Sequence, residues 1–306
     1  MFVLSVLLSG CGAPPPLDRG VMDQTWLSES EQRPVRELTL TDHRGEGFGD
    51  AQLAGRWTVF AIGYTSCPDV CPTTLRALSQ AIDLINAPIQ PVFLAVDTER
   101  DRTALPNYAP FFHDRLLGVS GEPEAVQQAV DALGGSFEVT LADGRLQVDH
   151  ATSLFLVDPS GLVNGYALRP SDPSILAADL TAAMDAWTPT VSMEGWIPPA
   201  PPSAPSLAAY GRLINHTAET LTLEAIESDD FNHAHAHETV ASNGSASMNN
   251  TTLTIPPAGE FALRPGAHHL MLMSPKRDLK AGDTSVLRLR FSGGHDVLVA
   301  LPVEEQ

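Results

Sequence analysis

The sequence is poor in positive charge and in long apolar segments. Lys and Arg number 18 against 37 Asp and Glu, so the formal net charge is −19. This balance argues against a nucleic-acid partner and favours a soluble protein that attracts cations. Beyond the N-terminus no apolar run reaches the length of a membrane-spanning helix, and no internal repeat is evident. With 306 residues and 43% hydrophobic residues, the chain is long enough for two ordinary globular domains.

Cysteine is also scarce, with three residues in the chain, but two of them form a close pair. Cys67 and Cys71 follow an apolar run, residues 57–62, that is predicted to be a buried strand. Behind them Pro72 opens a stretch, residues 75–85, in which apolar side chains recur at helical spacing. The pair is therefore expected on a strand-to-helix turn. Cys71 then lies near the helix N-terminus, where free N–H groups favour a thiolate.

Two neighbouring thiolates have more than one use. They can cycle with a disulfide, or they can hold a soft metal such as Cu(I). Thioredoxin-type redox pairs usually have two intervening residues, and three stand here, which weakens a purely redox interpretation without excluding it. A structural disulfide is a further alternative, although a proline after each cysteine at a helix start is typical of a reactive site.

The third cysteine, Cys11, ends the segment Leu8-Ser9-Gly10-Cys11 after an apolar N-terminus. This segment resembles the lipobox of bacterial lipoproteins. The resemblance implies cleavage before Cys11, lipidation, and a membrane tether in the oxidising periplasm. The positive segment of a signal peptide is absent, so a start further upstream or an accidental match remain alternatives. We predict a signal and lipobox over residues 1–11 and a polar tether over residues 12–34.

Residues 35–187 show alternating strand and helix patterns. A turn signal, Asp143-Gly144, separates two strand-like runs, and a helical pattern over 174–187 closes the region. Such alternation predicts an α/β domain of the thioredoxin-like class. His150 stands just before a predicted strand, where a histidine taken alone is more often a surface residue than a ligand.

Three stretches of this region resemble the Sco/SenC family of copper-delivery proteins. They are residues 63–75 (GYTSCPDVCPTTL), residues 96–101 (VDTERD) and Asp149-His150 before residues 154–156. The resemblance implies that Cys67, Cys71 and His150 are copper ligands, with Asp97 as an accessory acidic residue. Thr98 departs from the family, which usually has proline there. Two thiolates and an imidazole suit Cu(I), with Cu(II) as an alternative, and their need for deprotonation predicts weaker binding in acid.

After Trp187 the helix signal disappears and short strand-like runs alternate with Gly-containing turns. This pattern predicts an all-β sandwich. The proline-rich residues 198–205 have the composition of a linker. The resemblance described next instead places the linker at 188–194 and the second domain at 195–304.

The second region resembles the PCuAC family of periplasmic copper chaperones, which have a cupredoxin-like fold. The resemblance rests on Trp196, on residues 208–210, on His237 with Met248 eleven positions later, and on residues 263–273 (LRPGAHHLMLM). The implied copper ligands are His237, Met248, His269 and Met271. Twenty residues separate Met248 from His269, one fewer than in the family, which leaves the assignment of Met248 less secure. Met271 and Met273 could alternatively be core residues of a strand.

Three histidines of this region, His233, His235 and His237, alternate with alanines and would share one face of a strand. His233 and His235 are therefore candidates for an accessory copper site, and a solvated histidine-rich loop is an equal alternative.

Taken together, the two resemblances predict a membrane-tethered periplasmic copper chaperone. The family link implies a respiratory client, the dinuclear copper centre of cytochrome c oxidase subunit II, whose cysteines the thiols could also reduce. One rival interpretation is a thiol-disulfide oxidoreductase with a β docking domain, with Cys67 and Cys71 as its redox pair. A copper or redox sensor is a third interpretation, which no sequence feature favours.

Overall fold

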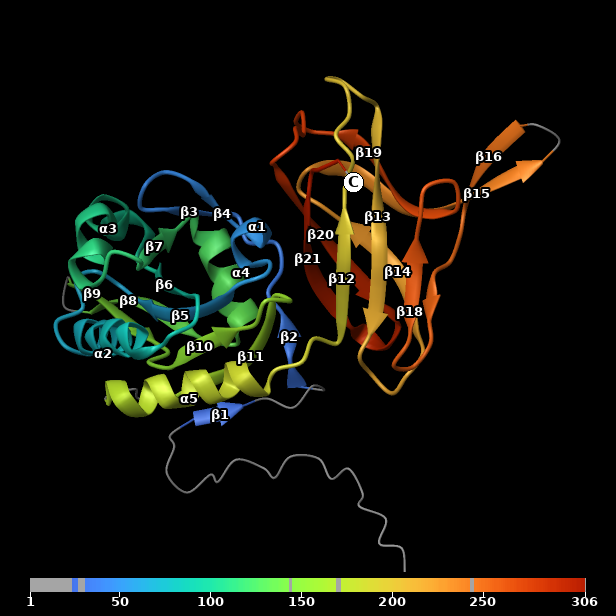
Figure 1. Ribbon diagram of the computed structural model, residues 1–306. Helices are drawn as coiled ribbons and strands as arrows, with labels where there is room; N and C mark the ends of the chain where they lie inside the picture. Colours follow the sequence, from blue (N-terminus) through green and yellow to red (C-terminus); the bar gives the residue numbers. More distant parts are fainter. Residues whose placement is uncertain (1–23, 27–30, 143–144, 169–171, 243–244, 306) are drawn as a thin grey trace, which may run out of the picture.

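The structure is a computed structural model that describes residues 24–26, 31–142, 145–168, 172–242 and 245–305. These residues form an α/β domain followed by a β domain, which lie side by side (Figure 1). Cys11 and its lipobox lie outside the described residues. Among the described residues, no helix is both long and apolar enough to cross a bilayer.

The first domain is built on a nine-stranded mixed sheet with the order β1-β11-β10-β5-β6-β7-β3-β4, and β2 also pairs with β11. Its three central strands, β5, β6 and β7, run parallel. The strands are β1 (Gln24–Trp26), β2 (Arg33–Pro34), β3 (Leu40–Asp42), β4 (Gly47–Phe48), β5 (Trp57–Gly63), β6 (Ile89–Ala95), β7 (Leu117–Ser120), β10 (Leu154–Val157) and β11 (Leu162–Ala167).

Helices cover both faces of this sheet because its central strands are apolar on both sides. Every residue of β5 is buried, as expected of a parallel strand between two helical layers. One core lies under α2, α3 and α5, and the other under α1 and α4. The helices are α1 (Asp50–Leu53), α2 (Val70–Leu84), α3 (Thr98–Phe112), α4 (Pro123–Leu133) and α5 (Pro173–Ala186).

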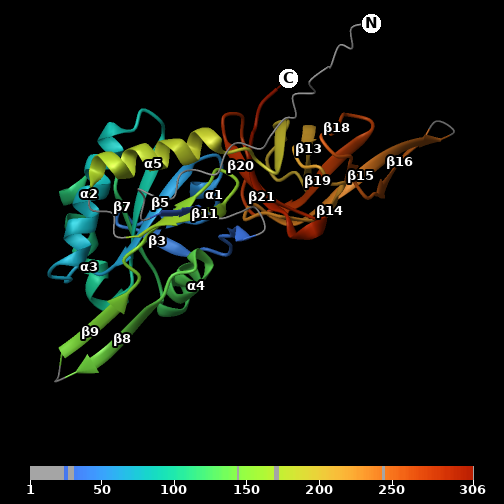
Figure 2. The same cartoon turned by 90° about the horizontal axis from the view of Figure 1, so that it is seen from below.

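A separate hairpin projects from the first domain (Figure 2). It consists of β8 (Phe137–Ala142) and β9 (Arg145–His150), and its base pairs Phe137 with His150. Because the N–H of Ala151 donates to the carbonyl of Ser136 over 2.8 Å, the end of β9 is fixed at the body of the domain. His150 thus lies at the base of the hairpin, next to the body of the domain.

The second domain packs two antiparallel sheets around one apolar core, as expected for a β sandwich. One sheet has the order β12-β13-β19-β15-β16 with β18 against β13, and the other has the order β17-β14-β20-β21. The strands are β12 (Val191–Trp196), β13 (Ser206–Asn215), β14 (Leu221–Glu227), β15 (Phe231–Ser242), β16 (Ser245–Asn250), β17 (Thr254–Ile255), β18 (Glu260–Leu263), β19 (His268–Pro275), β20 (Thr284–Phe291) and β21 (Asp296–Pro302).

Two stretches predicted to be irregular contain strands. Strands β1 and β2 lie within residues 12–34, the predicted tether, and both pair with β11. Strand β12 begins at Val191, within the predicted linker 188–194, and pairs along its whole length with β13. The connection between α5 and β12 is therefore shorter than the sequence suggested.

A buried arginine joins the two domains. Arg288 of β20 is 3% exposed, and its guanidinium donates to the carbonyl of Val35 over 2.8 Å. It also bonds both carboxylate oxygens of Asp50, at 2.8 and 3.1 Å, and one oxygen of Asp296 at 2.8 Å. Arg36 of the first domain forms a second ion pair with Asp296. The buried charges at this junction are thus paired across the domain boundary.

Strand β21 contributes the apolar part of the same junction. Leu298 is 5% exposed and packs into the core of the first domain rather than its own. Its N–H donates to the carbonyl of Ser160 over 2.9 Å. The next residue, Gly161, has a φ of 80°, and a Cβ there would stand 2.6 Å from the Leu298 side chain. The junction is therefore packed as tightly as a domain core.

Candidate metal centres

The first candidate centre lies where β5 ends and α2 begins. Cys71 is the second residue of α2 and is 3% exposed, while Cys67 in the preceding turn is half-buried. The ligand atoms of Cys67, Cys71 and His150 all lie within 4.8 Å of one another. No other histidine, cysteine, aspartate or glutamate of the described residues joins this group. Both cysteines are free thiols.

His150 presents one particular nitrogen to the thiols. Its Nε2 lies 3.3 Å from Sγ of Cys71, and its Nδ1 lies 2.9 Å from the carbonyl oxygen of Ala151. An Nδ1–H that donates to a carbonyl fixes the tautomer and leaves Nε2 free as a ligand. The ring of Tyr64 packs edge-on against the imidazole, with 5.8 Å between ring centroids. The imidazole is thus oriented before any ion binds.

The two thiols differ in their tendency to ionise. Burial opposes ionisation of Cys67, but N–H groups of Cys71 and Asp69 donate to its sulfur and bring the pKa of this thiol below its ordinary value. Burial raises the pKa of Cys71 to about 12, and the neighbouring Cys67 sulfur adds to this rise. Without a metal, therefore, Cys67 is the thiol that ionises more readily, and Cys71 keeps its proton.

The turn that carries Cys67 is held by Asp101 of α3, a residue with no exposed surface. One carboxylate oxygen accepts from the N–H and the hydroxyl of Thr65, at 2.8 and 2.6 Å, and the other accepts from the N–H of Asp97 at 3.2 Å. Burial raises the pKa of Asp101 despite these bonds. Asp101 lies in the motif of residues 96–101, and its supporting role is visible only in the structure.

Asp97, the predicted accessory residue, has a different environment. It is the N-cap of α3, where its carboxylate accepts from the N–H of Arg100 and forms an ion pair with the Arg100 side chain. Capping a helix and pairing with an arginine are both structural roles, and together they account for an aspartate at this position. It does not belong to the group formed by Cys67, Cys71 and His150.

The second candidate centre lies on the sheet of the β domain, where β15 and β19 run side by side. His237 stands directly opposite His269, and their ring centroids are 5.8 Å apart. His269 is 3% exposed, and its Nδ1 lies 3.2 Å from the carbonyl of Ala267, which leaves Nε2 free. The Nδ1 of His237 is buried and has no hydrogen-bond partner among the described residues. A buried nitrogen left in this state is suited to a metal ion.

The pairing of β15 with β19 and with β16 sets the positions of the two predicted methionine ligands. Met271 follows His269 by two positions and so lies on the same face of β19. Met248 pairs with Thr239, which is two positions from His237, so Met248 lies diagonally across the hairpin on that face. Met248 is 59% exposed. His237, His269 and Met271 thus share one face of two adjacent strands, and Met248 lies on the same face at the surface.

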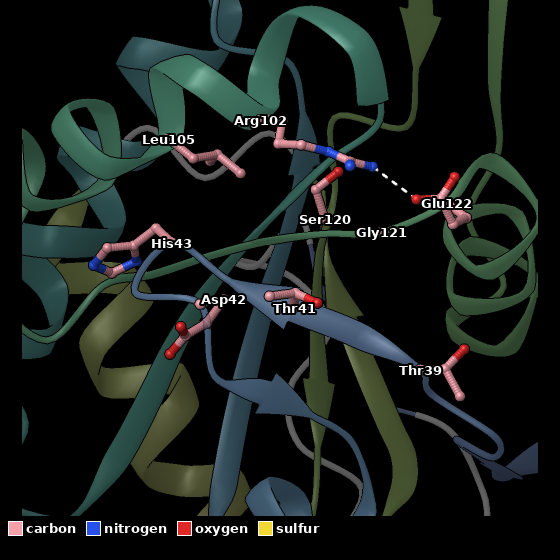
Figure 3. Close-up of a pocket in the computed structure, with 10 residues that line it drawn as sticks. Thr39, Thr41, Asp42, His43, Arg102, Leu105, Ser120, Gly121 and Glu122 are labelled. Carbon is pink, nitrogen blue, oxygen red and sulfur yellow. Dashed lines mark hydrogen bonds and ion pairs between the residues drawn. The ribbon is translucent and has the colours of Figure 1, made fainter.

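The first domain also has a cavity of about 350 Å³ that is separate from both candidate centres (Figure 3). Asp42 and His43 line one side of it, and the ion pair of Arg102 with Glu122 lies on another. None of the predicted site residues lines this cavity.

Comparisons with known proteins divide the chain where the fold does. Residues 28–185, just over half of the 306 residues, match the SCO1/SenC family model. The chain belongs to the SCO1/SenC family. Residues 191–303 match the model of the LpqE-like family, so the SCO1/SenC domain and the LpqE-like domain coincide with the α/β and β domains.

Relatives of the SCO1/SenC domain come from bacteria and mitochondria. The human mitochondrial protein SCO2 homolog is 34% identical over 164 residues, which is 51% of this chain and 62% of that protein. A Stutzerimonas stutzeri protein named for copper binding is 31% identical over 176 residues, which is 55% of this chain and 86% of that protein. The chain spans between 53% and 62% of the first mitochondrial relatives that it matches.

Solved structures include a similar protein. Arabidopsis thaliana ScoI with copper bound is 29% identical, with a TM-score of 0.46. It covers 50% of this chain and 99% of its own.

Proposed function

We propose that the protein is an extracytoplasmic copper chaperone that holds Cu(I) in each of its two domains. The observation that carries this proposal is the convergence of two free thiols and one oriented imidazole, with Cys71 Sγ 3.3 Å from His150 Nε2. Two sulfurs and an imidazole form a donor set that selects Cu(I) over harder cations. Membership of the SCO1/SenC family and the copper-binding Stutzerimonas relative support the same cargo.

The LpqE-like domain supplies the second Cu(I) site in this proposal. His237, His269, Met271 and Met248 are its ligands, as the resemblance to the PCuAC family implies. Thioether ligands need no deprotonation, and they hold Cu(I) in an oxidising compartment where free thiols are lost. The unpartnered Nδ1 of His237 supports this ligand set.

We further propose the dinuclear copper centre of cytochrome c oxidase subunit II as the client, and a lipid anchor at Cys11 as the membrane tether. The client follows from the two family resemblances. The tether follows from the lipobox, and the LpqE-like match supports an extracytoplasmic location. A tether would keep the protein beside a membrane-bound client and raise its effective concentration there.

Metal analysis of the purified protein after loading with Cu(I) tests the two sites. Each domain should bind copper, Cys67→Ser should remove the copper of the first, and His269→Gln should remove the main copper of the second. Glu99→Ala serves as a control, because Glu99 is exposed and outside both sites. Unchanged copper content in Cys67→Ser would refute the first site.

Transfer to the client is measured with the apo soluble domain of cytochrome c oxidase subunit II. Copper should move from the loaded protein to that domain, and the dinuclear centre should form with its characteristic absorption spectrum. No transfer to this client from a chain that binds copper would reject the client and keep the metal sites.

The asymmetry of the two thiols favours a second function, reduction of disulfides. Cys67 is accessible and ionises easily, as an attacking thiol does, while Cys71 is buried behind it and can resolve a mixed disulfide. Reduction of the client's disulfide would convert Cys67 and Cys71 to a disulfide and release two client thiols. His150→Ala separates the functions, because it should abolish Cu(I) retention and leave reductase turnover unchanged.

A further inference from the structure

Soft donor side chains continue along β15 and β19 beyond the proposed second site. The register pairs His237 with His269, then His235 with Met271, then His233 with Met273. Each pair is displaced by two residues from the last, so all six side chains point to the same face of the sheet. We call this row of three pairs the His/Met ladder.

The ladder lies on the face of the sheet that is turned away from the sandwich core. The alternate residues of the same two strands, Ala234, Ala236, Leu270 and Leu272, are buried in the sandwich core. On the neighbouring strand β13, small residues stand beside the methionines: Ala208 pairs with Met271 and Ser206 with Met273. Small neighbours leave room for an ion over the sheet.

Exposure falls steadily along the ladder. His233 and His235 are exposed, His237 is half-buried, and His269 is 3% exposed. The outer end is thus accessible to a copper donor, and the inner end is shielded from water.

We propose that His233, His235 and Met273 form a further Cu(I) site at the outer end of the ladder, through which copper reaches the proposed ligands His237, His269 and Met271. This inference rests on the proposed function of the LpqE-like domain.

The reach of the side chains supports one ion among these three donors. Directly opposite residues of antiparallel strands have Cβ atoms about 5 Å apart, and residues two apart on one strand lie about 7 Å apart. Histidine and methionine side chains are long enough to bring one nitrogen or sulfur each to a shared ion, for which bonds of about 2.0–2.3 Å are typical.

Methionine is essential to this arrangement. Among the described residues, no group of three histidines, cysteines or acidic residues with ligand atoms within 4.8 Å includes a ladder residue. A site of hard or borderline ligands alone is therefore not formed here. A thioether added to two imidazoles favours Cu(I) over Cu(II) and Zn²⁺.

Passage along the ladder requires only ligand exchange. Met271 and His235 form the middle pair, so an ion held by the outer residues can bind Met271 before it leaves His233. The ion remains Cu(I) throughout, and no electron is transferred. One thioether or imidazole bond to copper breaks as another forms.

The test uses the full chain with Cys67→Ser and Cys71→Ser, so that only the LpqE-like domain binds copper. Cu(I) is supplied with ascorbate and buffered by bicinchoninate, and bound copper is counted after desalting. We expect about two Cu(I) per chain in this background and about one after His233→Gln with Met273→Leu. His216→Gln, an exposed histidine of the same domain outside the ladder, should keep about two.

Further variants separate the possible results. His269→Gln in the same background should remove the inner ion and keep the outer one. His233→Gln alone should weaken outer binding without affecting the fold, because this side chain is exposed. Circular dichroism checks that each variant is folded. Unchanged copper content in the His233→Gln, Met273→Leu variant would overturn the ladder site. A background chain that binds no Cu(I) would instead refute the proposed copper function of the whole domain.

Discussion

The two cysteines of the SCO1/SenC domain have only three residues between them in sequence, yet their environments differ sharply. Cys67 lies in a turn whose N–H groups stabilise a negative sulfur, and Cys71 lies under it against the sheet. One sulfur is therefore ready to take an ion or attack a disulfide, while the other ionises only when a metal or a covalent partner compensates for burial.

Alkylation of the metal-free protein with iodoacetamide should show this difference. The thiolate is the nucleophile, so each rate rises with pH through the pKa of its thiol. The lowered pKa of Cys67 moves its profile to lower pH than that of an ordinary thiol, and the pKa of about 12 keeps Cys71 nearly unreactive below pH 10. Mass spectrometry of each peptide measures both rates, and equal rates at pH 7 would contradict this expectation.

Sequence reasoning identified the residues with metal-ligand chemistry more readily than those that support them. Asp97 and Asp101 belong to one acidic motif, from which the family resemblance selects Asp97 as the accessory residue. The start of α3 determines the role of each aspartate. Because the helix begins at Thr98, Asp97 is its N-cap and Asp101 points toward Thr65. That orientation depends on where a turn ends, which composition does not determine.

At the scale of elements, the end of β5 fixes the geometry of the first site. Gly63 is its last residue, and a Cβ there would stand 2.7 Å from Sγ of Cys71 and 2.8 Å from the ring of Phe93. Only a residue without a side chain lets α2 start so close to the sheet.

Gly63→Ala should therefore weaken Cu(I) binding by about tenfold or more, because a displacement of Cys71 by a few tenths of an ångström disturbs a preformed ligand set. The melting temperature should fall as well, since Cys71 and Phe93 are both buried. Gly47→Ala is the matched control, because nothing lies within 4 Å of a Cβ at that position. Competition with bicinchoninate measures the affinity, and equal affinities of the two variants would show that the close approach does not matter.

The connection between β5 and α2 depends on Asp101 in the same way. Asp101→Ala leaves buried donors of Thr65 and Asp97 unpaired and should lower the free energy of unfolding by about 2–4 kcal/mol. A raised pKa means that Asp101 contributes most below its unfolded pKa and less as pH rises through its folded pKa. The loss should therefore be larger at pH 4 than at pH 7. Urea denaturation measures it, and a loss no greater than that of Glu99→Ala would contradict the role.

Local patterns predicted most elements because periodicity depends on near neighbours. The hairpin expected around Asp143-Gly144 has its strands as β8 and β9, and the helical pattern over 174–187 corresponds to α5. By contrast, α3 has a weak sequence signal, since its Asp97 cap and internal prolines do not form an apolar stripe. The linker predicted at residues 188–194 overlaps β12, whose burial comes from its partner strand β13.

At the scale of the molecule, the junction fixes where the two sites point. Strands β9 and β15, which carry His150 and His237, lie at opposite ends of the molecule in both views (Figures 1 and 2). Direct exchange of an ion between the domains of one chain would need the paired charges around Arg288 to separate. The arrangement therefore favours exchange with a client or between chains.

Arg288→Met should loosen this junction. It leaves the half-buried Asp50 without its arginine and the buried Asp296 with Arg36 alone, at a cost of about 3–5 kcal/mol. Calorimetry should then resolve separate melting transitions for the domains, where the parent melts in one. Arg290→Met is the control, because Arg290 lies on the same strand and forms an ion pair with Glu227 at the surface. A single unshifted transition in Arg288→Met would show that the junction contributes nothing.

No pattern in the sequence predicts this junction between the domains. Arg288 bonds Asp50 and Val35 across 238 and 253 positions of the chain, and a lone arginine in a β strand is usually at the surface. Long-range pairing of this kind is determined by how two finished domains fit together.

The insertion of Leu298 beside Gly161 has a practical consequence for anyone who wants the halves in isolation. A cut at residues 187–190 would expose Leu298 and part of the Arg288 guanidinium on one fragment. On the other fragment it would leave an open space beside Gly161 and the Asp50 carboxylate without Arg288. Isolated domains of this chain are thus poor substitutes for relatives that consist of one such domain alone. Point substitutions in the intact polypeptide are the cleaner way to silence one site at a time.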